Sequence, residues 1–522
     1  MPTSIRLPIP ILSVYSFMKR LLSVLLVGFA LSAQAQKNVL LDQSFWQSKP
    51  DVNQVKAEVE KGSNPSQLNP MGFDPVVMAI NAGAPTETVK YLLAQPGNDV
   101  SKLTHDGRIY IHWAANRGNV ELMEYLLSKG SKANLEDNHG MTVLNFAAAT
   151  GQPNTQVYDL CLKNGADLKK ELNHDGANAL LLAIANDKDL KLTDYFVAKG
   201  LDLKSTDAAG NNAFSYAARG GNINTMKALV AKGVPAQDNA FIMASQGSRR
   251  GPNSPEVFQY LESLNLKPTV TNKNGENALH AIVRRPRQNE LIQYFLSKGV
   301  DVNQADEDGN TVFMNAAASN RDITVLDLLL PKVKNINQAN QKGVTALAMA
   351  VKGNTPDVVS YLLSKGADVG VTDKTGDNLA AYLIQSNPAM GGARGEGGPR
   401  PEGGPQTDDF TAKLKLLQDK GLDVKAPQKN GNTLYHLAVA KNDLTLLKKL
   451  EPLQIDVNAR NKEGITALHK AAMISKDDAM LKYLLSIGAK KDIPTNFKET
   501  AFDLASENET LSKSNISLNF LK

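Results

Sequence analysis

KEGITALHKAAMISKDDAMLKYLLSIGAKKD, residues Lys462–Asp492, is the clearest copy of a unit that recurs along the chain. Gly464 marks a turn, and Thr466 can cap the alanine-rich segment that follows it. A second amphipathic segment carries leucines at helical spacing and stops at Gly488, a residue suited to a left-handed helix end. The sequence of this unit therefore predicts a tight turn followed by two helices.

Turn glycines repeat this unit at a nearly constant period. Most successive glycines are 33 to 36 residues apart, and two gaps are longer, at 65 and 55 residues. The gap of 65 contains a degenerate repeat near residues 239–271, which keeps the second-helix segment EVFQYLESL and has lost the TxLH signature. With both ends counted, we expect about 13 repeats. The glycines are Gly107, Gly140, Gly176, Gly210, Gly275, Gly309, Gly343, Gly376, Gly431 and Gly464.

The order of turn, TALHKAA helix, leucine-rich helix and Gly-Ala resembles the ankyrin repeat, which has a period of about 33 residues and a T-P-L-H-x-A core. Ala467 stands where that pattern has proline. The resemblance covers about Asn38–Lys522 and implies an all-α solenoid of stacked helix-turn-helix units with short β-turn tips. It also implies a non-catalytic scaffold that binds a protein partner through a concave surface of turn tips and inner helices.

The N-terminal segment has the pattern of a secretory signal peptide. Met18-Lys19-Arg20 precede the apolar stretch LLSVLLVGFALSA, and AQA follows, so we expect cleavage after Ala35. Thirteen apolar residues are fewer than the roughly 20 that span a bilayer. We therefore expect a soluble, exported protein, periplasmic or secreted, with no transmembrane segment.

The predicted segments follow from these signals. Residues 386–407, SNPAMGGARGEGGPRPEGGPQT, are too rich in glycine and proline to bury a core and are predicted to be a mobile surface insertion. A tolerated insertion is favoured over a tethered recognition segment. The other segments are 1–17, a misassigned upstream stretch; 18–35, the signal peptide; 36–69, an N-terminal capping repeat; 70–385 and 408–496, ankyrin repeats; and 497–522, a C-terminal capping repeat.

All seven histidines occupy positions that the repeat explains. The histidine of the TxLH motif is expected to hydrogen-bond the backbone near its turn; these residues are His112, His280, His436 and His469. His105, His139 and His174 lie in three successive turns, which raises the alternative of a metal or pH-sensing ladder. Layers about 8–10 Å apart argue against shared metal ligation, because each ligand nitrogen must lie about 2 Å from the ion.

Other residues with chemical potential also fit a structural role. The single cysteine, Cys161, stands where other repeats have leucine and is predicted to be a buried thiol. Trp113, Phe146 and Tyr216 follow the histidine position and are expected in the core. Five tyrosines precede helix-ending glycines by five residues and are expected to pack between repeats with a solvated hydroxyl; they are Tyr125, Tyr195, Tyr294, Tyr361 and Tyr483.

An enzyme is disfavoured by the sequence. The chain has no GxGxxG or GxxxxGK[ST] phosphate loop, no HExxH and no GxSxG motif. Outside the repeats, the insertion is too short for a catalytic domain. We therefore expect no catalytic residues, no cofactor and no metal site.

The binding surface is predicted from a local excess of positive charge. The whole chain has a formal net charge of +5, whereas residues 209–289 alone carry ten basic and four acidic side chains. Arginine suits carboxylate or phosphate, so the hypothesis is a monomer that binds an acidic protein face, with anionic envelope glycan or lipid phosphate as the alternative and nucleic acid disfavoured. The candidate residues are Arg219, Arg249, Arg250, Arg284, Arg285 and Arg287.

Overall fold

The structure is a computed structural model that describes residues 38–248, 253–386, 409–514 and 516–522. Within these ranges the chain forms 28 α-helices, α2 to α29, which pair in chain order into 14 repeats. Repeat 1 holds α2 and α3, and each later repeat holds the next two helices. The count exceeds the expected 13 because counting turn glycines from Gly107 omits the repeat that Gly72 opens. The predicted upstream stretch and signal peptide, residues 1–35, and residues 387–407 of the predicted insertion lie outside the described residues.

The chain divides into two compact units, residues 1–174 and 175–522. Unit 1 holds repeats 1 to 4, with 3₁₀ helices η1 (Val39–Leu41) and η2 (His105–Gly107) and the α-helices α2 (Gln43–Gln47), α3 (Val52–Glu60), α4 (Pro75–Ala82), α5 (Thr86–Leu93), α6 (Tyr110–Asn116), α7 (Val120–Ser128), α8 (Val143–Ala149) and α9 (Thr155–Lys163).

Unit 2 holds repeats 5 to 14. Their first helices are α10 (Ala179–Ile184), α12 (Ala213–Gly220), α14 (Ala240–Gln246), α16 (Ala278–Ile282), α18 (Val312–Ser319), α20 (Ala346–Gly353), α22 (Leu379–Ser386), α24 (Leu434–Ala440), α26 (Ala467–Ile474) and α28 (Ala501–Glu507). Their second helices are α11 (Lys191–Ala198), α13 (Ile223–Ala231), α15 (Pro255–Ser263), α17 (Asn289–Ser297), α19 (Ile323–Leu329), α21 (Pro356–Ser364), α23 (Asp409–Asp419), α25 (Leu444–Leu450), α27 (Ala479–Ser486) and α29 (Glu509–Lys513). The 3₁₀ helices are η3 (Leu330–Lys332), η4 (Glu451–Leu453) and η5 (Asn519–Leu521).

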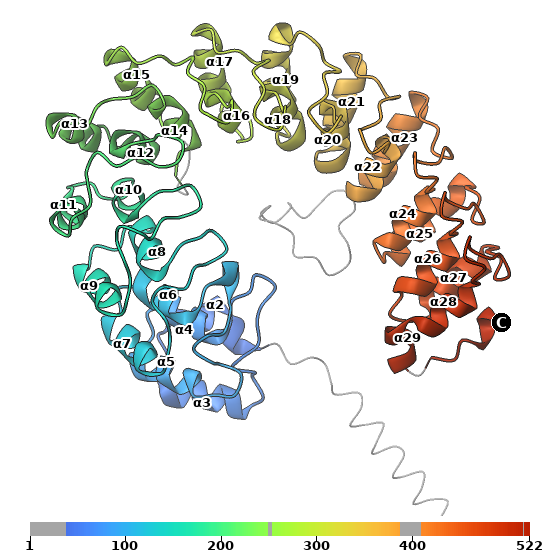
Figure 1. Ribbon diagram of the computed structural model, residues 1–522, viewed down its shortest axis with the longest axis horizontal. Coiled ribbons are helices and arrows are strands. Elements are labelled where there is room, and N and C mark those ends of the chain that lie inside the picture. The colour runs from blue at the N-terminus through green and yellow to red at the C-terminus, as the bar shows by residue number, and fades with distance from the viewer. Residues whose placement is uncertain (1–37, 249–252, 387–408, 515) are drawn as a thin grey trace, which may run out of the picture. The chain divides into compact units, whose positions relative to one another are not determined.

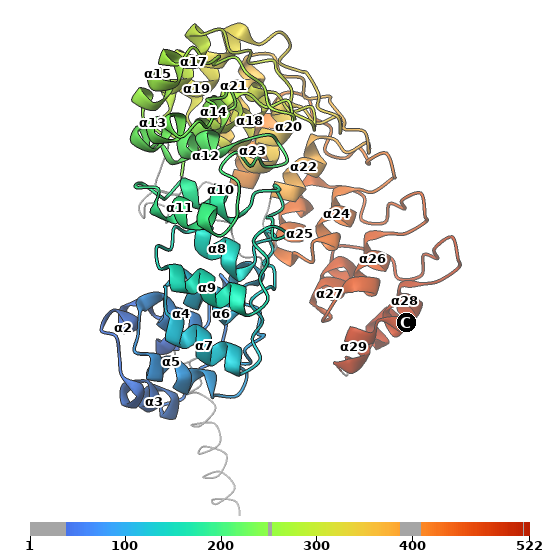
Figure 2. The same ribbon diagram turned by 60° about the vertical axis from the view of Figure 1, so that its left-hand side comes forward.

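Unit 2 is a stack of two helical layers. The first helix of each repeat lies on the inner side of the stack and the second on the outer side (Figure 1). The loops between repeats project together from one side (Figure 2). They form isolated β-bridges, such as Ala305 with Thr311 and Ala339 with Thr345. The predicted all-α solenoid with short β-turn tips is confirmed.

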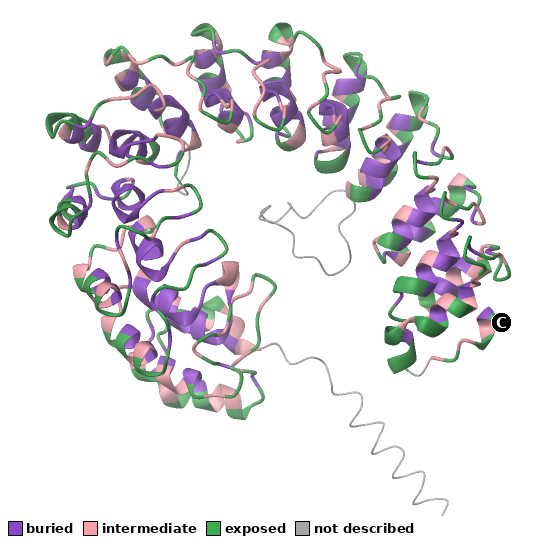
Figure 3. Ribbon diagram, viewed as in Figure 1, coloured by how far each residue is buried: buried purple, intermediate pink, exposed green. Residues whose placement is uncertain are grey.

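Repeat 13, the stretch that defined the unit, folds as its sequence predicts. Thr466 is the N-cap of α26, and its hydroxyl accepts a hydrogen bond from the His469 N–H at 3.4 Å. Met480, Leu481 and Leu484 of α27 are buried, and Gly488 ends the repeat with a φ of +97°. Buried residues face neighbouring helices throughout both units, while exposed residues face outward (Figure 3). Each repeat therefore buries its apolar face against its neighbours.

Repeat 7 is the repeat near residues 239–271 that the sequence predicts to be degenerate. Its first helix, α14, is present and Phe241 within it is fully buried, although the TxLH signature is missing. The hairpin is what has been lost, because only residues 232–239 connect α13 to α14, whereas residues 199–212 connect α11 to α12. The Lys273 ammonium of repeat 8 donates instead to the Ala208 carbonyl of repeat 6 at 2.7 Å. One side chain thus bridges the missing turn.

Repeat 11 places a lysine in the core. Lys413 of α23 lies eight residues before Gly421, where the matching residues of other repeats are Val358 and Met480. It is only 3% exposed, and its ammonium donates to the Val351 carbonyl at 2.9 Å in the last turn of α20. Burial lowers the pKa of Lys413. This burial could not be predicted from the sequence, because a lysine in an amphipathic helix is ordinarily expected to be exposed.

Replacing this buried ammonium by a thioether is expected to stabilise unit 2. In Lys413→Met the desolvation cost of the charge disappears, and the gain should exceed the loss of one bond to a carbonyl, giving about 1 kcal/mol of extra stability. Urea denaturation followed by circular dichroism measures the difference. Lys415→Met, at an exposed position of the same helix, is the control and should change little. A less stable Lys413→Met protein would contradict the prediction.

Candidate functional site

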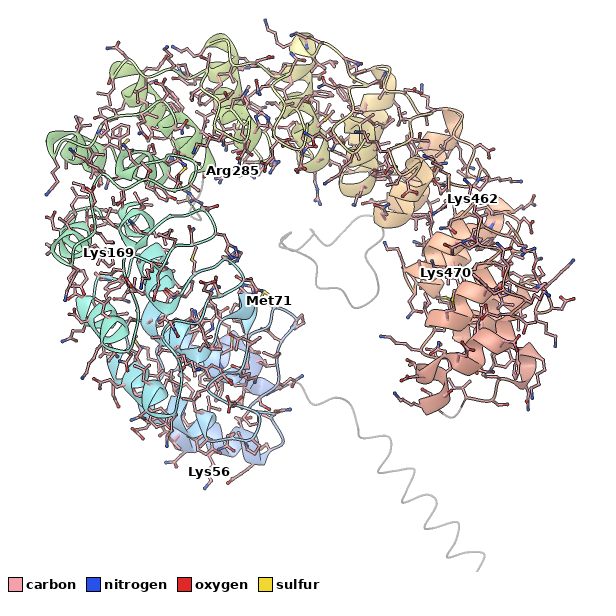
Figure 4. The ribbon with its side chains drawn as sticks, in the orientation of Figure 1. Lys56, Met71, Lys169, Arg285, Lys462 and Lys470 are labelled. Atoms are coloured by element: carbon pink, nitrogen blue, oxygen red, sulfur yellow. The ribbon has the colours of Figure 1, made fainter. Side chains whose placement is uncertain are left out.

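The predicted arginine surface maps to the ends of the inner helices in repeats 6 to 8. Arg219 is in the last turn of α12, and Arg284 and Arg285 follow α16 directly. Arg287 lies in the loop that leads to α17. Figure 4 shows Arg285 on the inner side of unit 2. We call Arg219, Arg284, Arg285 and Arg287 the basic edge. Arg249 and Arg250 lie outside the described residues.

Arg285 has a structural task within the basic edge. Its guanidinium donates to the carbonyl of Gln246, the last residue of α14, and so satisfies one of the acceptors that a helix C-terminus leaves free. Burial lowers the pKa of Arg285, and the charge of Arg219 lowers it further. This interaction between like charges is repulsive, so packing across repeat 7, and not attraction, places Arg219 near Arg285. Mutation of Arg285 therefore tests stability as well as binding.

The other three arginines are exposed. Arg284 donates to Oδ1 of Asn315 at 2.9 Å, which is a neutral acceptor. Within the described part of the chain, no carboxylate lies within 4.0 Å of the guanidinium groups of Arg219, Arg284 and Arg287. The positive charge of the basic edge is therefore not balanced by ion pairs of its own.

Cations on the outer helices behave differently. Lys232 lies 2.9 Å from Asp194, Lys298 lies 2.6 Å from Glu262, and Lys365 lies 3.8 Å from Asp327, each pair joining neighbouring repeats. Such exposed pairs contribute little stability, but they neutralise the surface locally. Not every lysine of the outer helices is paired in this way, because Lys227 and Lys448 contact tyrosine rings instead. What distinguishes the basic edge is its cluster of arginines, to which a partner can supply negative charge.

Arg287 also carries backbone strain. Its φ is +60°, in the left-handed region that favours glycine. Repeats 3 and 6 have Gly118 and Gly221 in the matching loop, at φ values of +68° and +70°. A side chain held in an unfavourable backbone conformation at an exposed position supports a functional role for that side chain.

The TxLH histidines are confirmed as backbone-bonded in repeats 8, 12 and 13. Nδ1 of His436 accepts from the Thr433 N–H at 3.1 Å, which makes Nε2 the protonated nitrogen that donates to the Ile465 carbonyl at 2.9 Å. His469 repeats this geometry, and Nδ1 of His280 accepts from the Asn277 N–H at 3.0 Å. Burial lowers the pKa of all three. These rings serve helix capping, not ligand binding.

His112 differs because the N-cap of its helix, α6, is Ile109, whose side chain can neither donate nor accept a hydrogen bond. The ring is fully buried, and among the described residues neither nitrogen has a partner in hydrogen-bond geometry. Burial lowers the pKa of His112 to about 4. The ring therefore lacks the cap bond that His436 makes, because isoleucine replaces threonine at the N-cap, although backbone interactions with Met141 and Ile109 partly offset the effect of burial on its pKa.

The turn histidines of unit 1 surround one carboxylate. Nε2 of His105 and Nε2 of His139 lie 3.3 and 3.5 Å from Oδ2 of Asp106, and Arg108 reaches the same oxygen at 3.0 Å. Although burial alone raises it, the electrostatic interactions with His105, Arg108 and His139 hold the pKa of Asp106 below its usual value. Buried Arg108 also bonds Asp137 at 2.8 Å, so the cluster ties two hairpins together. No group of three potential metal ligands was found among the described residues.

The aromatic residues after the histidine position lie in the core, as expected. Trp113, Phe146 and Tyr216 are at most 6% exposed. Trp113 donates to Thr104 at 2.9 Å and Tyr216 to Asp207 at 3.0 Å, in each case nine residues back in the hairpin. This recurring spacing of nine was a signal in the sequence that could have been found. The buried state of Cys161 is also confirmed, and burial raises the pKa of its thiol to about 12.

The tyrosine column of the outer helices is half-buried, as expected for packing between repeats. The prediction of solvated hydroxyls is wrong at Tyr294, whose hydroxyl is buried. At two other positions a carboxylate of the preceding repeat accepts the exposed hydroxyl. Tyr361 donates to Asp327 at 2.6 Å and Tyr483 donates to Glu451 at 2.8 Å. The column therefore joins adjacent outer helices and offers no binding stripe of free hydroxyls at these two positions.

Comparison with known proteins gives a family match. The model described as "Ankyrin repeats (3 copies)" matches residues 76–170, 241–337, 279–373 and 435–516, together more than half of the chain. No described helix has the length and apolar composition needed to cross a membrane.

Three relatives share part of the chain. Phosphocholine transferase AnkX from Legionella pneumophila is 26% identical over 176 residues, which is 34% of this chain and 18% of that protein. Putative ankyrin repeat protein FPV031 from fowlpox virus is 28% identical over 164 residues, 30% of this chain and 42% of that protein. Neurogenic locus notch homolog protein 1 from Homo sapiens is 26% identical over 176 residues, 31% of this chain and 7% of that protein. The match thus spans less than half of each relative.

Proposed function

The chain belongs to the ankyrin-repeat family, and from this premise we propose that it is a non-catalytic scaffold that binds an acidic protein partner at the basic edge of repeats 6 to 8. Repeats of this family mediate protein binding. The observation that carries the proposal is a set of three exposed arginines, Arg219, Arg284 and Arg287, which have no carboxylate partner among the described residues and lie in a segment, 209–289, with ten basic and four acidic side chains.

The chemistry of the edge favours carboxylates on a partner. Each guanidinium offers a planar fork of donors, and bidentate bonds to carboxylate are among the stronger hydrogen bonds in proteins. Neighbouring layers about 8–10 Å apart place the side chains over three repeats, so a partner with several acidic residues can engage them together. Because the groups are exposed, binding should weaken as salt rises.

The proposal includes export to the cell envelope or beyond. It rests on the pattern of residues 18–35, which precede the described part of the chain. The phosphocholine transferase among the relatives is matched over 18% of its length, so its named activity is not part of the proposal.

The direct test is a titration of the full chain with fluorescently labelled polyglutamate at low and high salt. Binding at low salt that weakens as salt rises supports the proposal, and no binding at low salt contradicts it. Inorganic polyphosphate is the comparison probe: a clear preference for polyphosphate would instead favour the alternative, an anionic envelope glycan or lipid phosphate.

Arg287→Gly is expected to separate stability from binding. Glycine adopts a φ of +60° without strain, so the variant should be more stable by about 1 kcal/mol. At the same time it loses one guanidinium, so polyglutamate binding should weaken several-fold. Urea denaturation and fluorescence anisotropy measure the two effects. Gly221→Ala is the control: it creates backbone strain without changing the charge, so it should lower stability and leave polyglutamate binding unchanged. If Arg287→Gly binds polyglutamate as tightly as the parent, Arg287 is not part of the site.

A further inference from the structure

The hairpins of unit 1 carry exposed leucines at a repeated position. Four residues before the turn glycine stand Leu68, Leu103 and Leu172, with exposed fractions of 44%, 65% and 44%. The same position in unit 2 holds small, polar or charged residues or proline: Thr206, Thr271, Ala305, Ala339, Thr372, Pro427 and Arg460. The leucines are thus not a requirement of the hairpin fold.

The hairpin between those of Leu103 and Leu172 also carries an exposed leucine, one residue away from the repeated position. It has Glu136 at the repeated position, but its neighbour Leu135 is 40% exposed. We call Leu68, Leu103, Leu135 and Leu172 the leucine strip. Single exposed apolar residues are ordinary, whereas exposed leucines on four consecutive hairpins, three of them at the same repeated position, form a candidate contact surface.

The described chain begins beside this strip. The Asn38 side-chain amide donates to the Asn64 carbonyl at 2.8 Å and to the Gln67 side chain at 2.9 Å. Gln67 immediately precedes Leu68, so whatever precedes Asn38 enters the fold next to the first leucine of the strip.

The preceding segment has matching chemistry. Residues 21–33 are the apolar stretch LLSVLLVGFALSA, and five residues separate Ala33 from Asn38. Five residues can span about 17 Å, so the apolar stretch is within reach of Leu68 and the next hairpin layer. A tether this short gives the stretch a high effective concentration at the strip.

We propose that, while residues 1–35 remain attached, the apolar stretch 21–33 docks on the leucine strip and covers it. Removal of the segment then exposes the strip for the mature protein. The proposal concerns unit 1 only and does not depend on the basic edge of unit 2.

Disulfide trapping in the full-length chain tests the contact. The variant Leu25→Cys with Leu103→Cys should form an intramolecular disulfide under mild oxidation about tenfold faster than a control in which Leu25→Cys is combined with Glu124→Cys, an exposed residue of the outer helix α7. The native Cys161 does not compete, because it is buried with a pKa of about 12.

The outcomes separate the alternatives. Faster trapping at Leu103 that is lost when Leu22→Ser and Leu26→Ser are added supports docking of the apolar stretch. Equal trapping at Leu103 and Glu124 overturns the proposal. A disulfide between two chains at Leu103 would also overturn it, because the strip would then be covered by a second copy.

Discussion

Lowering the pH from 7 to 4 is expected to destabilise unit 1 by about 3 kcal/mol through His112 alone. Its pKa is about 4 in the folded protein and about 6.5 in the unfolded chain. The unfolded state therefore binds the proton first, so the stability that His112 contributes is complete above about pH 6.5 and falls as the pH drops toward 4. Each pH unit in this window costs about 1.4 kcal/mol.

His112→Asn removes this titration with a residue that the fold already uses, because repeat 4 has Asn145 at the matching position. Denaturation at pH 7 and pH 4.5 can be followed by tryptophan fluorescence, since both tryptophans, Trp46 and Trp113, belong to unit 1. The variant should lose most of the difference between the two pH values. His174→Asn, at an exposed turn, is the control and should behave like the parent; an unchanged slope in His112→Asn would refute the assignment.

Charge reversal of the exposed arginines should have the largest effect on binding. In the triple variant Arg219→Glu, Arg284→Glu and Arg287→Glu, each lost contact is worth about 1 kcal/mol, so affinity for polyglutamate should fall about 100-fold. Melting should change little because all three side chains are exposed. Arg285 is kept, because it satisfies the C-terminal carbonyl of α14.

A matched control distinguishes the basic edge from net charge. The triple variant Lys232→Glu, Lys298→Glu and Lys365→Glu changes the charge by the same amount on the outer helices, where each lysine is already paired. It should keep most of the affinity. Equal losses of polyglutamate affinity in both variants would show that only the net charge matters and would contradict the assignment of the site.

The fold could be predicted because its signals are local and repeated. Thr466 before ALHKAA and Gly488 after the leucines specify a cap, two helices and a stop, and many copies in phase outweigh an irregular one. Repeat 7 shows the limit, because the missing TxLH motif near Asn239 does not reveal that Phe241 still anchors α14 in the core while the hairpin before that helix is lost.

The candidate site could be predicted only in part, because the sequence shows which side chains are charged but not which groups they contact in the folded protein. Arg219 and Arg285 lie 66 positions apart, and only packing across repeat 7 brings them together. Counting charges could not reveal that Arg285 bonds the Gln246 carbonyl, nor that Lys413 reaches the Val351 carbonyl. Such contacts join a side chain of one repeat to the main chain of another, and no local pattern encodes them.

The long connection inside repeat 11 has a consequence for how such a chain can evolve. Residues 387–408 join α22 to α23, whereas residues 354–355 suffice between α20 and α21. Loop-closure entropy grows only with the logarithm of length, so the longer link costs about 2 kcal/mol. Because each repeat packs only against its neighbours, that cost is not multiplied along the chain. The connection between two helices of a repeat is thus a place where new sequence can be acquired, lengthened or exchanged by recombination, while the surrounding repeats continue to diverge independently.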